Sequence, residues 1–435
     1  MAIDDLDRPA PPATAASARP VGARVVRRRS VLAVGAGLTA LPLVAAFSGP
    51  ADAATTRGAA PAAEPGAATE AVAEALAAGG AVNTTKATTQ HPLYIGGYTT
   101  SSAQGVGLAT YDPTTGRPTA TGTLAGVANP SFLALSGSHL YAVDEQTKGA
   151  VTAISVVSPG HLTSLGSQST GGSGPCHVSV HPAGRHLLSA NYDSGSIAVH
   201  PIAADGSLKA RSDLVKHTGS GPDPDRQDGP HAHMVISDPQ GAYVLAVDLG
   251  TDSVYSYTLN TTTGKLTPVS QAKVAPGTGP RHLAFHPSGQ YAYLANELGN
   301  SVIVCRYNPS TGALTPGRPQ PTVPSGAPTT PRNYPAEVVV SPDGAFVYVS
   351  NRGHDSVARF AVGSAGATLT LLDAVPAGGA YPRHISLDPT ATLLFSANQN
   401  SNTVTVFRRN TTTGALTATG TSLTSTSPVC VLPVQ

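Results

Sequence analysis

One pattern recurs through most of this 435-residue chain and restricts what the chain can fold into. Each copy opens with a residue followed by proline, continues as a short apolar or β-branched stretch, and closes in a proline-containing turn. The clearest copies are residues 174–182, 279–289, 334–342 and 381–389. Short apolar stretches bounded by Pro and Gly are typical of β-strands joined by turns.

The rest of each copy is equally regular. A second stretch ends in a polar residue, as in residues 291–296, and a third follows a Ser-Val step, as at Ser301. A Thr-Gly turn, as at Thr311, then leads to a short fourth stretch. Four short antiparallel strands that recur about every 45–55 residues are the sequence form of one propeller blade.

The opening prolines indicate how many blades there are and how they close. They are Pro130, Pro175, Pro230, Pro280, Pro335, Pro382 and Pro428. Residues 93–119 supply outer strands without an inner one, whereas residues 428–432 supply an inner strand without outer ones. We therefore predict an all-β fold, a seven-bladed β-propeller over residues 91–435, closed by the C-terminal strand joining the N-terminal blade. Closure removes exposed sheet edges, and the continuous repeat excludes a division into two domains.

The first 90 residues lack the repeat. Arg27, Arg28 and Arg29 precede an apolar run that ends near Phe47, and residues 51–53 read Ala-Asp-Ala. This order predicts a twin-arginine export signal over residues 1–53, with a retained membrane anchor as the alternative. Residues 54–90, rich in Ala, Pro and Thr, predict a disordered linker. The expected protein is secreted, with the twin-arginine translocase as its partner during export and no stable membrane insertion after cleavage.

Composition excludes several classes of function. With 26 Lys and Arg against 25 Asp and Glu, the chain lacks the basic excess of a nucleic-acid-binding protein. The absence of tryptophan excludes a WD-type repeat. Cys176, Cys305 and Cys430 lie in strand-like apolar contexts, which predicts small buried side chains rather than a disulfide. No group of residues has zinc-site spacing, so we predict no metal site and no cofactor.

Aligning the blades indicates which side chains meet at the central channel. In an antiparallel hairpin, the start of the first strand and the end of the second lie at the same edge. The residues after the opening prolines are Ser131, Cys176, Arg281, Ala336, Arg383 and Val429. In the remaining blade, which has two extra residues after Gly229, counting back from Asp238-Pro239 places His233 at this position. The residues after the second strands are Glu145, Tyr192, Leu249, Glu297, Arg352 and Gln399. Only 12% of the chain is charged, so this concentration of charge predicts a functional site at one channel mouth.

Structural interpretations exist for the same residues. The Asn or Asp that ends each second strand is a typical turn residue that hydrogen-bonds its own backbone. His181-Pro182 and His286-Pro287 fall at the opposite end of the hairpin and are interpreted as turn formers. The alternative for Arg281 and Glu297 is an ion pair that only braces a blade. The three histidines that share one register beside the channel are interpreted as structural; they are His177, His282 and His384.

Three motifs resemble a known family. They are Gly-Pro-Arg-His-x-x-x-His-Pro at residues 279–287, Asn296-Glu297, and Pro-His-x-His at residues 230–233. From about residue 91 to its end the chain is similar to the lactonase-type seven-bladed propellers, which include the bacterial propeller form of 6-phosphogluconolactonase and the fungal carboxy-cis,cis-muconate cyclase. In the cyclase branch a histidine, an arginine, a glutamate and a second arginine line the cleft. The matching positions here are His233, Arg281, Glu297 and Arg352.

This resemblance implies a hydrolase that opens a sugar or carboxylate lactone. We expect His233 or Glu297 to act as the base, and Arg281 and Arg352 to bind the oxyanion or a carboxylate. The residues expected to hold the rest of the substrate are Arg383, Tyr192, Glu145, His231 and Gln399. The alternatives are a muconate-type lactonising cyclase and a non-catalytic secreted propeller that binds a ligand. A calcium-dependent sugar lactonase would need a channel rich in oxygen ligands, which the arginine-rich mouth disfavours.

Overall fold

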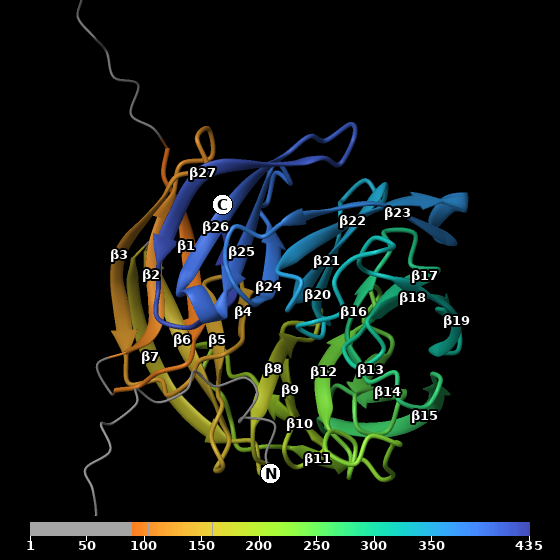
Figure 1. Cartoon of the computed structure of the whole chain (residues 1–435). Helices are drawn as coiled ribbons and strands as arrows, with labels where there is room; N and C mark the ends of the chain where they lie inside the picture. The colour runs from red at the N-terminus through yellow and green to blue at the C-terminus, as the bar shows by residue number, and fades with distance from the viewer. Residues whose placement is uncertain (1–88, 102–103, 159) are drawn as a thin grey trace, which may run out of the picture. The chain divides into compact units, whose positions relative to one another are not determined.

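The computed structural model describes residues 89–101, 104–158 and 160–435. Their strands form seven four-stranded antiparallel sheets, set as blades around a ring (Figure 1). The predicted all-β, seven-bladed propeller is confirmed. The predicted export signal (1–53) lies outside the described residues, as does the predicted linker (54–90) except for its last two residues. No helix among the described residues is long and apolar enough to cross a membrane.

Each blade contributes four strands, counted outward from the channel. The inner strands are β28 (Pro428–Pro433), β4 (Leu133–Ser136), β8 (Pro175–Val180), β12 (Ala232–Ser237), β16 (Pro280–Phe285), β20 (Tyr334–Val340) and β24 (Pro382–Leu387). The second strands are β1 (His91–Gly97), β5 (His139–Asp144), β9 (His186–Asn191), β13 (Val244–Asp248), β17 (Tyr291–Asn296), β21 (Phe346–Arg352) and β25 (Leu393–Asn398).

The outer half of each blade follows the same order. The third strands are β2 (Gly105–Tyr111), β6 (Ala150–Ser158), β10 (Ser196–Pro201), β14 (Ser253–Asn260), β18 (Ser301–Asn308), β22 (Ser356–Gly363) and β26 (Thr403–Arg409). The fourth strands are β3 (Pro118–Ala125), β7 (His161–Ser169), β11 (Asp213–Lys216), β15 (Lys265–Lys273), β19 (Ala313–Pro321), β23 (Thr368–Pro376) and β27 (Leu416–Thr424). Two 3₁₀ turns, η1 (Ser364–Gly366) and η2 (Gln399–Ser401), complete the described elements.

The ring closes as the repeat predicts. Strand β28 pairs antiparallel with β1, with Leu93 opposite Pro433 and Tyr94 opposite Leu432. One blade is therefore built from both ends of the described chain. Strand β28 covers the edge of β1 that would otherwise be unpaired. Three inner strands begin at other residues than predicted. Those expected to open at Pro130, Pro230 and Pro335 begin at Leu133, Ala232 and Tyr334.

The polar residue at the end of each second strand has a specific partner. The side-chain amides of Asn191, Asn296 and Asn351 donate to the hydroxyl of the serine that opens the third strand, over 3.0, 3.2 and 3.2 Å. The sequence interpretation of a turn residue is correct, but its expected backbone partner is wrong in these three blades. The Asn…Ser-Val pattern exists because this bond fixes the turn between the two strands.

The hydrophobic core lies between neighbouring blades rather than at the channel. One buried cluster joins Leu245 of β13 to Leu294 of β17 in the next blade. Tyrosines on second strands also bond across these boundaries, as Tyr348 does when it donates to the Gly414 carbonyl over 2.7 Å. Cys176, Cys305 and Cys430 are all buried and free, as predicted.

A β-bulge near the start of four inner strands matters most for the site. In β8, β16 and β24 the ladder shifts register at the residue after the opening proline, which is Cys176, Arg281 or Arg383. Strand β12 has the same shift at His233. A bulge leaves one residue out of the ladder and re-aims its side chain. In these four strands, the position that the alignment singled out is therefore a residue released from pairing.

Candidate functional site

Three arginines surround the carboxylate of Glu297, which directly follows β17. Arg281, in the bulge of β16, places its Nε atom 3.2 Å from Oε2. Arg352, at the end of β21 in the next blade, places Nη2 2.6 Å from the same oxygen. Arg226, from the connection between β11 and β12, pairs with Oε1. The structure thus brings together residues from two neighbouring blades and one inter-blade connection at one end of the channel.

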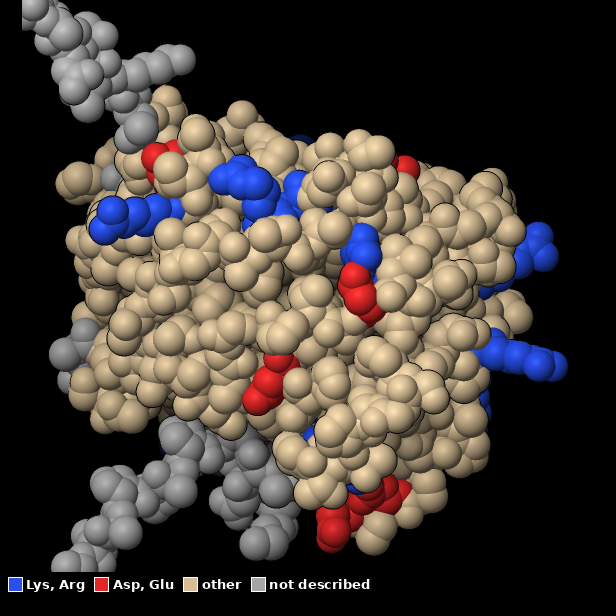
Figure 2. All heavy atoms as spheres, turned by 45° about the horizontal axis from the view of Figure 1, so that its top comes forward, with Lys and Arg blue, Asp and Glu red and all other residues tan. Residues whose placement is uncertain are grey.

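All four residues of this cluster are almost removed from solvent. Relative exposure is 3% for Glu297, 3% for Arg281, 1% for Arg352 and 9% for Arg226. On the face shown in Figure 2, by contrast, charged side chains are scattered and most of the surface is uncharged. Buried charges are stable only when they are paired, and here three cations share one carboxylate. The cluster therefore has an excess of positive charge that an anion would neutralise.

The arginines hold Glu297 in its ionised form. Burial acts to raise the pKa of this carboxyl, but Arg352, Arg226 and Arg281 outweigh burial and hold the pKa well below its usual range. Both of its carboxylate oxygens are already engaged by guanidinium groups, whereas a general base needs an atom that can reach the proton of the attacking water. Glu297 is therefore better suited to orient the guanidinium groups than to act as a general base.

Arg281 is the arginine whose pKa this buried environment lowers. Burial, together with Arg352 and Arg383, lowers the pKa of Arg281 to about 10, against the opposing effects of Glu297 and Glu337. Arg281 is still cationic at neutral pH. It also donates from Nη1 to the Ala336 carbonyl over 2.9 Å, which fixes the plane of its guanidinium group.

His233 lies beside this cluster in a neutral state. It is 4% exposed, and burial, Arg281 and His282 lower the pKa of its imidazole well below the usual value. Its Nδ1 atom is buried without a hydrogen-bond partner among the described residues. A buried polar atom of this kind is uncommon in native proteins. Its position next to Arg281 makes it a candidate contact for a bound ligand.

A cavity of about 390 Å³ reaches Arg226 and Glu297 of this cluster from the surface, while Arg281 and Arg352 lie behind its lining. Arg226 and Glu297 form its inner wall, and Arg332, Tyr334 and Tyr381 line its sides. The two tyrosine rings flank Arg352, whose guanidinium carbon lies 5.9 and 5.3 Å from their centroids. This volume falls within the usual range for a small-molecule site.

The other residues predicted for substrate binding lie around the same mouth. The ring of Tyr192 stacks on His231 at 4.5 Å and meets His233 edge-on at 5.5 Å. Glu145 accepts a hydrogen bond from Tyr98 over 3.1 Å, and Arg383 lies 5.8 Å from the centroid of the same Tyr98 ring. Gln399, 2% exposed, opens the turn η2. Arg383 and Glu145 thus meet at Tyr98 rather than at Glu297.

Sequence reasoning missed four residues of the site. Arg226 and Arg332 lie in long inter-blade connections outside the repeat, so blade alignment could not find them. Tyr334 and Tyr381 did carry a signal, because each directly precedes the opening proline of its blade. A bulky aromatic residue at that position in two consecutive blades indicates a lined cavity.

The histidines interpreted as structural form a separate buried group in the channel. The Nδ1 atom of His282 lies 3.0 Å from both carboxylate oxygens of Glu337, and Nε2 of His384 lies 3.3 Å from one of them. The ring of His177 meets that of His282 edge-on at 5.4 Å. Burial first, then neighbouring His282 and Arg281, lowers the pKa of His384 to about 4, although Glu337 opposes this. In the described part of the chain, no group of three or more His, Cys, Asp and Glu residues is arranged to hold a metal ion.

Comparison with known proteins agrees with this architecture. Residues 92–433 match the family described as "Lactonase, 7-bladed beta-propeller", and the chain belongs to this family. It is 36% identical to a 6-phosphogluconolactonase of Bacillus subtilis over 347 residues, which cover 79% of this chain and 98% of the relative.

Two solved structures have similar folds. A putative 6-phosphogluconolactonase of Bacteroides fragilis superposes with a TM-score of 0.74 at 35% identity, covering 81% of this chain and 99% of the other. The periplasmic gluconolactonase of Pseudomonas aeruginosa superposes with a TM-score of 0.74 at 30% identity, covering 80% and 99%.

Proposed function

We propose that this protein is a lactone hydrolase that acts on a sugar or carboxylate lactone bearing an anionic group. The observation that carries the proposal is the buried cluster of Arg226, Arg281 and Arg352 around Glu297, next to a neutral His233. Relatives named 6-phosphogluconolactonase and gluconolactonase support a sugar lactone as the substrate class.

The geometry supports one division of roles. The His233 imidazole takes a proton from water as the water oxygen bonds to the lactone carbonyl carbon. Arg281 stabilises the negative charge that develops on the carbonyl oxygen. The ring C–O bond then breaks, and its oxygen takes the proton back from His233, which leaves a hydroxy acid that ionises. Glu297 does not transfer a proton; it holds the guanidinium groups in place.

A lactone panel tests this function. We expect the full chain to open 6-phosphogluconolactone, gluconolactone or a muconolactone faster than the spontaneous reaction, measured as acid release at constant, slightly acidic pH. Addition of a chelator should leave the rate unchanged. Arg281→Ala should lower kcat/KM about 10²–10³-fold, the usual effect of losing one oxyanion donor.

Arg359→Ala is the matched control, because Arg359 pairs with Asp373 at the outer strands of its blade. It should leave kcat/KM unchanged. If no lactone is opened, the protein is a binding propeller and the proposal is wrong. Ring closure of a muconate without hydrolysis of any sugar lactone would identify the cyclase alternative.

We also propose that the protein is exported folded through the twin-arginine pathway. The support is the order of Arg27–Arg29, the following apolar run and the small-residue site at residues 51–53. In a bacterial host that has this translocase, the full chain should appear outside the cytoplasm in a shortened form. Replacing Arg27, Arg28 and Arg29 with lysine should retain it inside, and export of that variant would contradict the proposal.

A further inference from the structure

The connection between β11 and β12 brings Arg226 to the site from outside the repeat. It covers residues 217–231, whereas the corresponding connection between β7 and β8 covers only residues 170–174. Its Arg226 crosses the blade boundary to pair with Glu297. A long connection is free to adopt many conformations unless its ends and interior are held.

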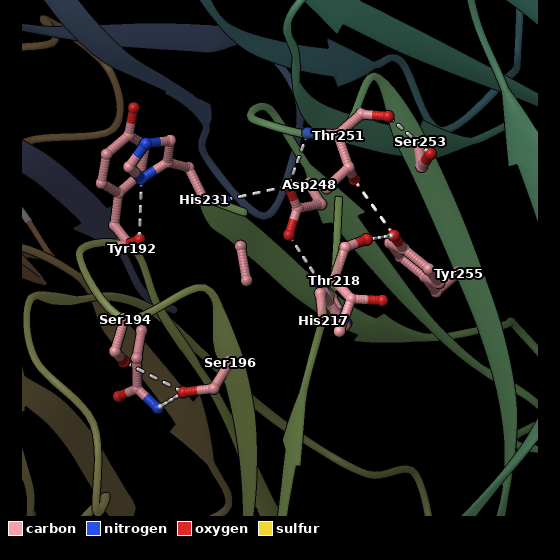
Figure 3. Close-up of polar contacts among 12 residues, drawn as sticks. Tyr192, Ser194, Ser196, His217, Thr218, His231, Asp248, Thr251, Ser253 and Tyr255 are labelled. Atoms are coloured by element: carbon pink, nitrogen blue, oxygen red, sulfur yellow. Dashed lines mark hydrogen bonds and ion pairs between the residues drawn. The ribbon is translucent and has the colours of Figure 1, made fainter. Parts of the chain in front are cut away.

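One buried carboxylate holds both ends of this connection (Figure 3). Asp248, at the end of β13, accepts a hydrogen bond from Nδ1 of His217 over 2.6 Å through Oδ2. Its Oδ1 atom accepts from the backbone N–H of His231 over 2.9 Å and of Thr251 over 3.0 Å. The His217 ring stacks on Tyr255 at 4.1 Å, which fixes its orientation.

Asp248 departs from the repeat at this point. In three other blades the equivalent residue is an asparagine that donates to the serine opening the third strand. Strand β14 also opens with a serine, Ser253, but its hydroxyl donates to the Thr251 carbonyl over 2.8 Å. The carboxylate of Asp248 is thereby free to bind the ends of the connection. Asp144 is an aspartate at the equivalent position of another blade, but it accepts from the Thr152 hydroxyl over 3.1 Å within that blade. The carboxylate of Asp248 instead binds the connection that carries Arg226.

The interior of the connection is also fixed. Gln227, fully buried, donates from Nε2 to the Leu249 carbonyl over 2.8 Å. Its backbone carbonyl accepts the N–H of Gly221 over 3.0 Å. Arg226 therefore precedes a residue that is tied to the end of the same strand, β13, that carries Asp248.

We propose that Asp248 and His217 are positioning residues that set the location of Arg226 over Glu297, so that the 217–231 connection determines how the substrate's anionic group is bound. This proposal rests on the proposed lactonase function. The same clamp holds His231 against Tyr192, the aromatic neighbour of His233. Displacing a positioned group by about 1 Å lowers activity on the order of 10²-fold.

A double-mutant cycle separates positioning from general stability. Asp248→Ala should lower kcat/KM for the substrate found in the lactone panel by about 10–100-fold, mainly through KM. In an Arg226→Ala background the same change should have less than about a threefold effect, because its target is already gone. An equal loss in both backgrounds, or no loss in either, would overturn the proposal.

The matched control is Asp238→Asn in the same blade. Asp238 is as buried as Asp248, and accepts the Tyr243 N–H over 2.9 Å and the Tyr307 hydroxyl over 3.1 Å at the opposite end of the hairpin. This variant should keep kcat/KM unchanged even if it lowers stability. His217→Phe, which keeps the ring against Tyr255 but removes the bond to Asp248, provides a second test variant should Asp248→Ala fail to fold.

Amide hydrogen exchange tests the clamp without relying on activity. Peptides from residues 218–230 should exchange at least about tenfold faster in Asp248→Ala or His217→Phe than in the unaltered chain, because their local opening becomes easier. Peptides from other blades, and the same peptides in Asp238→Asn, should not change. Unchanged exchange in the clamp variants overturns the inference. If the intact chain opens no lactone but exchange rises as expected, the lactonase function fails while the clamp is supported.

Discussion

Glu297→Gln should lower the free energy of unfolding by about 3–5 kcal/mol, the usual effect of removing one partner from a buried ion pair. The change leaves Arg226, Arg281 and Arg352 buried without the carboxylate that they share. The pKa of Glu297 is lowered on folding, so its contribution is fully present above the ordinary value of 4.5 and declines as the pH falls from there toward the lower folded-state pKa. The difference in unfolding free energy between variant and unaltered protein should therefore persist through neutral pH and begin to narrow below about pH 4.5. Urea unfolding of both proteins at several pH values measures this difference in the free energy of unfolding.

Glu337→Gln is the control for this experiment. Glu337 is a buried carboxyl of the same size, but burial raises its pKa, and its carboxylate contacts His282 and His384. A glutamine there still accepts a hydrogen bond from His282, so the loss should be nearer about 1 kcal/mol. Inorganic phosphate should recover more stability in Glu297→Gln than in Glu337→Gln, because it replaces the negative charge that the arginine cluster has lost. Equal losses in both variants would show that the arginine cluster does not depend on Glu297.

Most of the fold could be predicted from the blade repeat, because every blade uses the same kinds of residue to form its strands and turns. Its opening proline, its Asn…Ser pair and its Thr-Gly turn are each fixed by bonds within one or two blades. Strand closure followed from counting, since the unpaired halves at residues 93–119 and 428–432 had only each other. Interactions of this kind involve residues close together in the repeat, so a single sequence is enough to predict them.

The sequence predicted those site residues that occupy repeated positions of the blades. Arg281, Glu297 and Arg352 occupy aligned positions, so alignment of the blades predicts that they meet at one channel mouth. Arg226 follows no repeat, and only the fold of its connection takes it to Glu297. The choice between His233 and Glu297 as base also needed the structure, because it depends on three arginines converging on one carboxylate.

The β-bulges explain why adjacent residues of one inner strand reach different carboxylates. Arg281 and His282 follow each other in β16 but contact Glu297 and Glu337, respectively. The register shift between Pro280 and His282 releases Arg281 from the ladder, so Arg281 turns to Glu297 while His282 turns to Glu337. The extra residue in β16 thus separates the arginine cluster at Glu297 from the histidine group at Glu337.

His233→Asn should lower kcat for lactone opening about 10²–10⁴-fold, the usual contribution of a general base. Asparagine keeps a polar side chain near Arg281 and Tyr192 but has no group that takes a proton at neutral pH. Substrate binding through Arg226 and Arg352 should persist, so KM should change much less than kcat. Steady-state rates on the substrate found in the lactone panel measure both quantities.

The pH profile gives this assignment its sharper test. Burial, Arg281 and His282 lower the pKa of His233, so its neutral, proton-accepting form should persist below the usual histidine pKa of 6.5. The kcat/KM of the unaltered protein should then be level from pH 8 down through 6.5 and fall only at lower pH, because kcat/KM follows the groups of the free enzyme. His177→Asn, a change at a buried channel histidine that contacts Phe132 and His282, should lower stability and leave this profile unchanged. A midpoint at or above pH 6.5, or an acidic limb that survives in His233→Asn, would assign the proton transfer to another group.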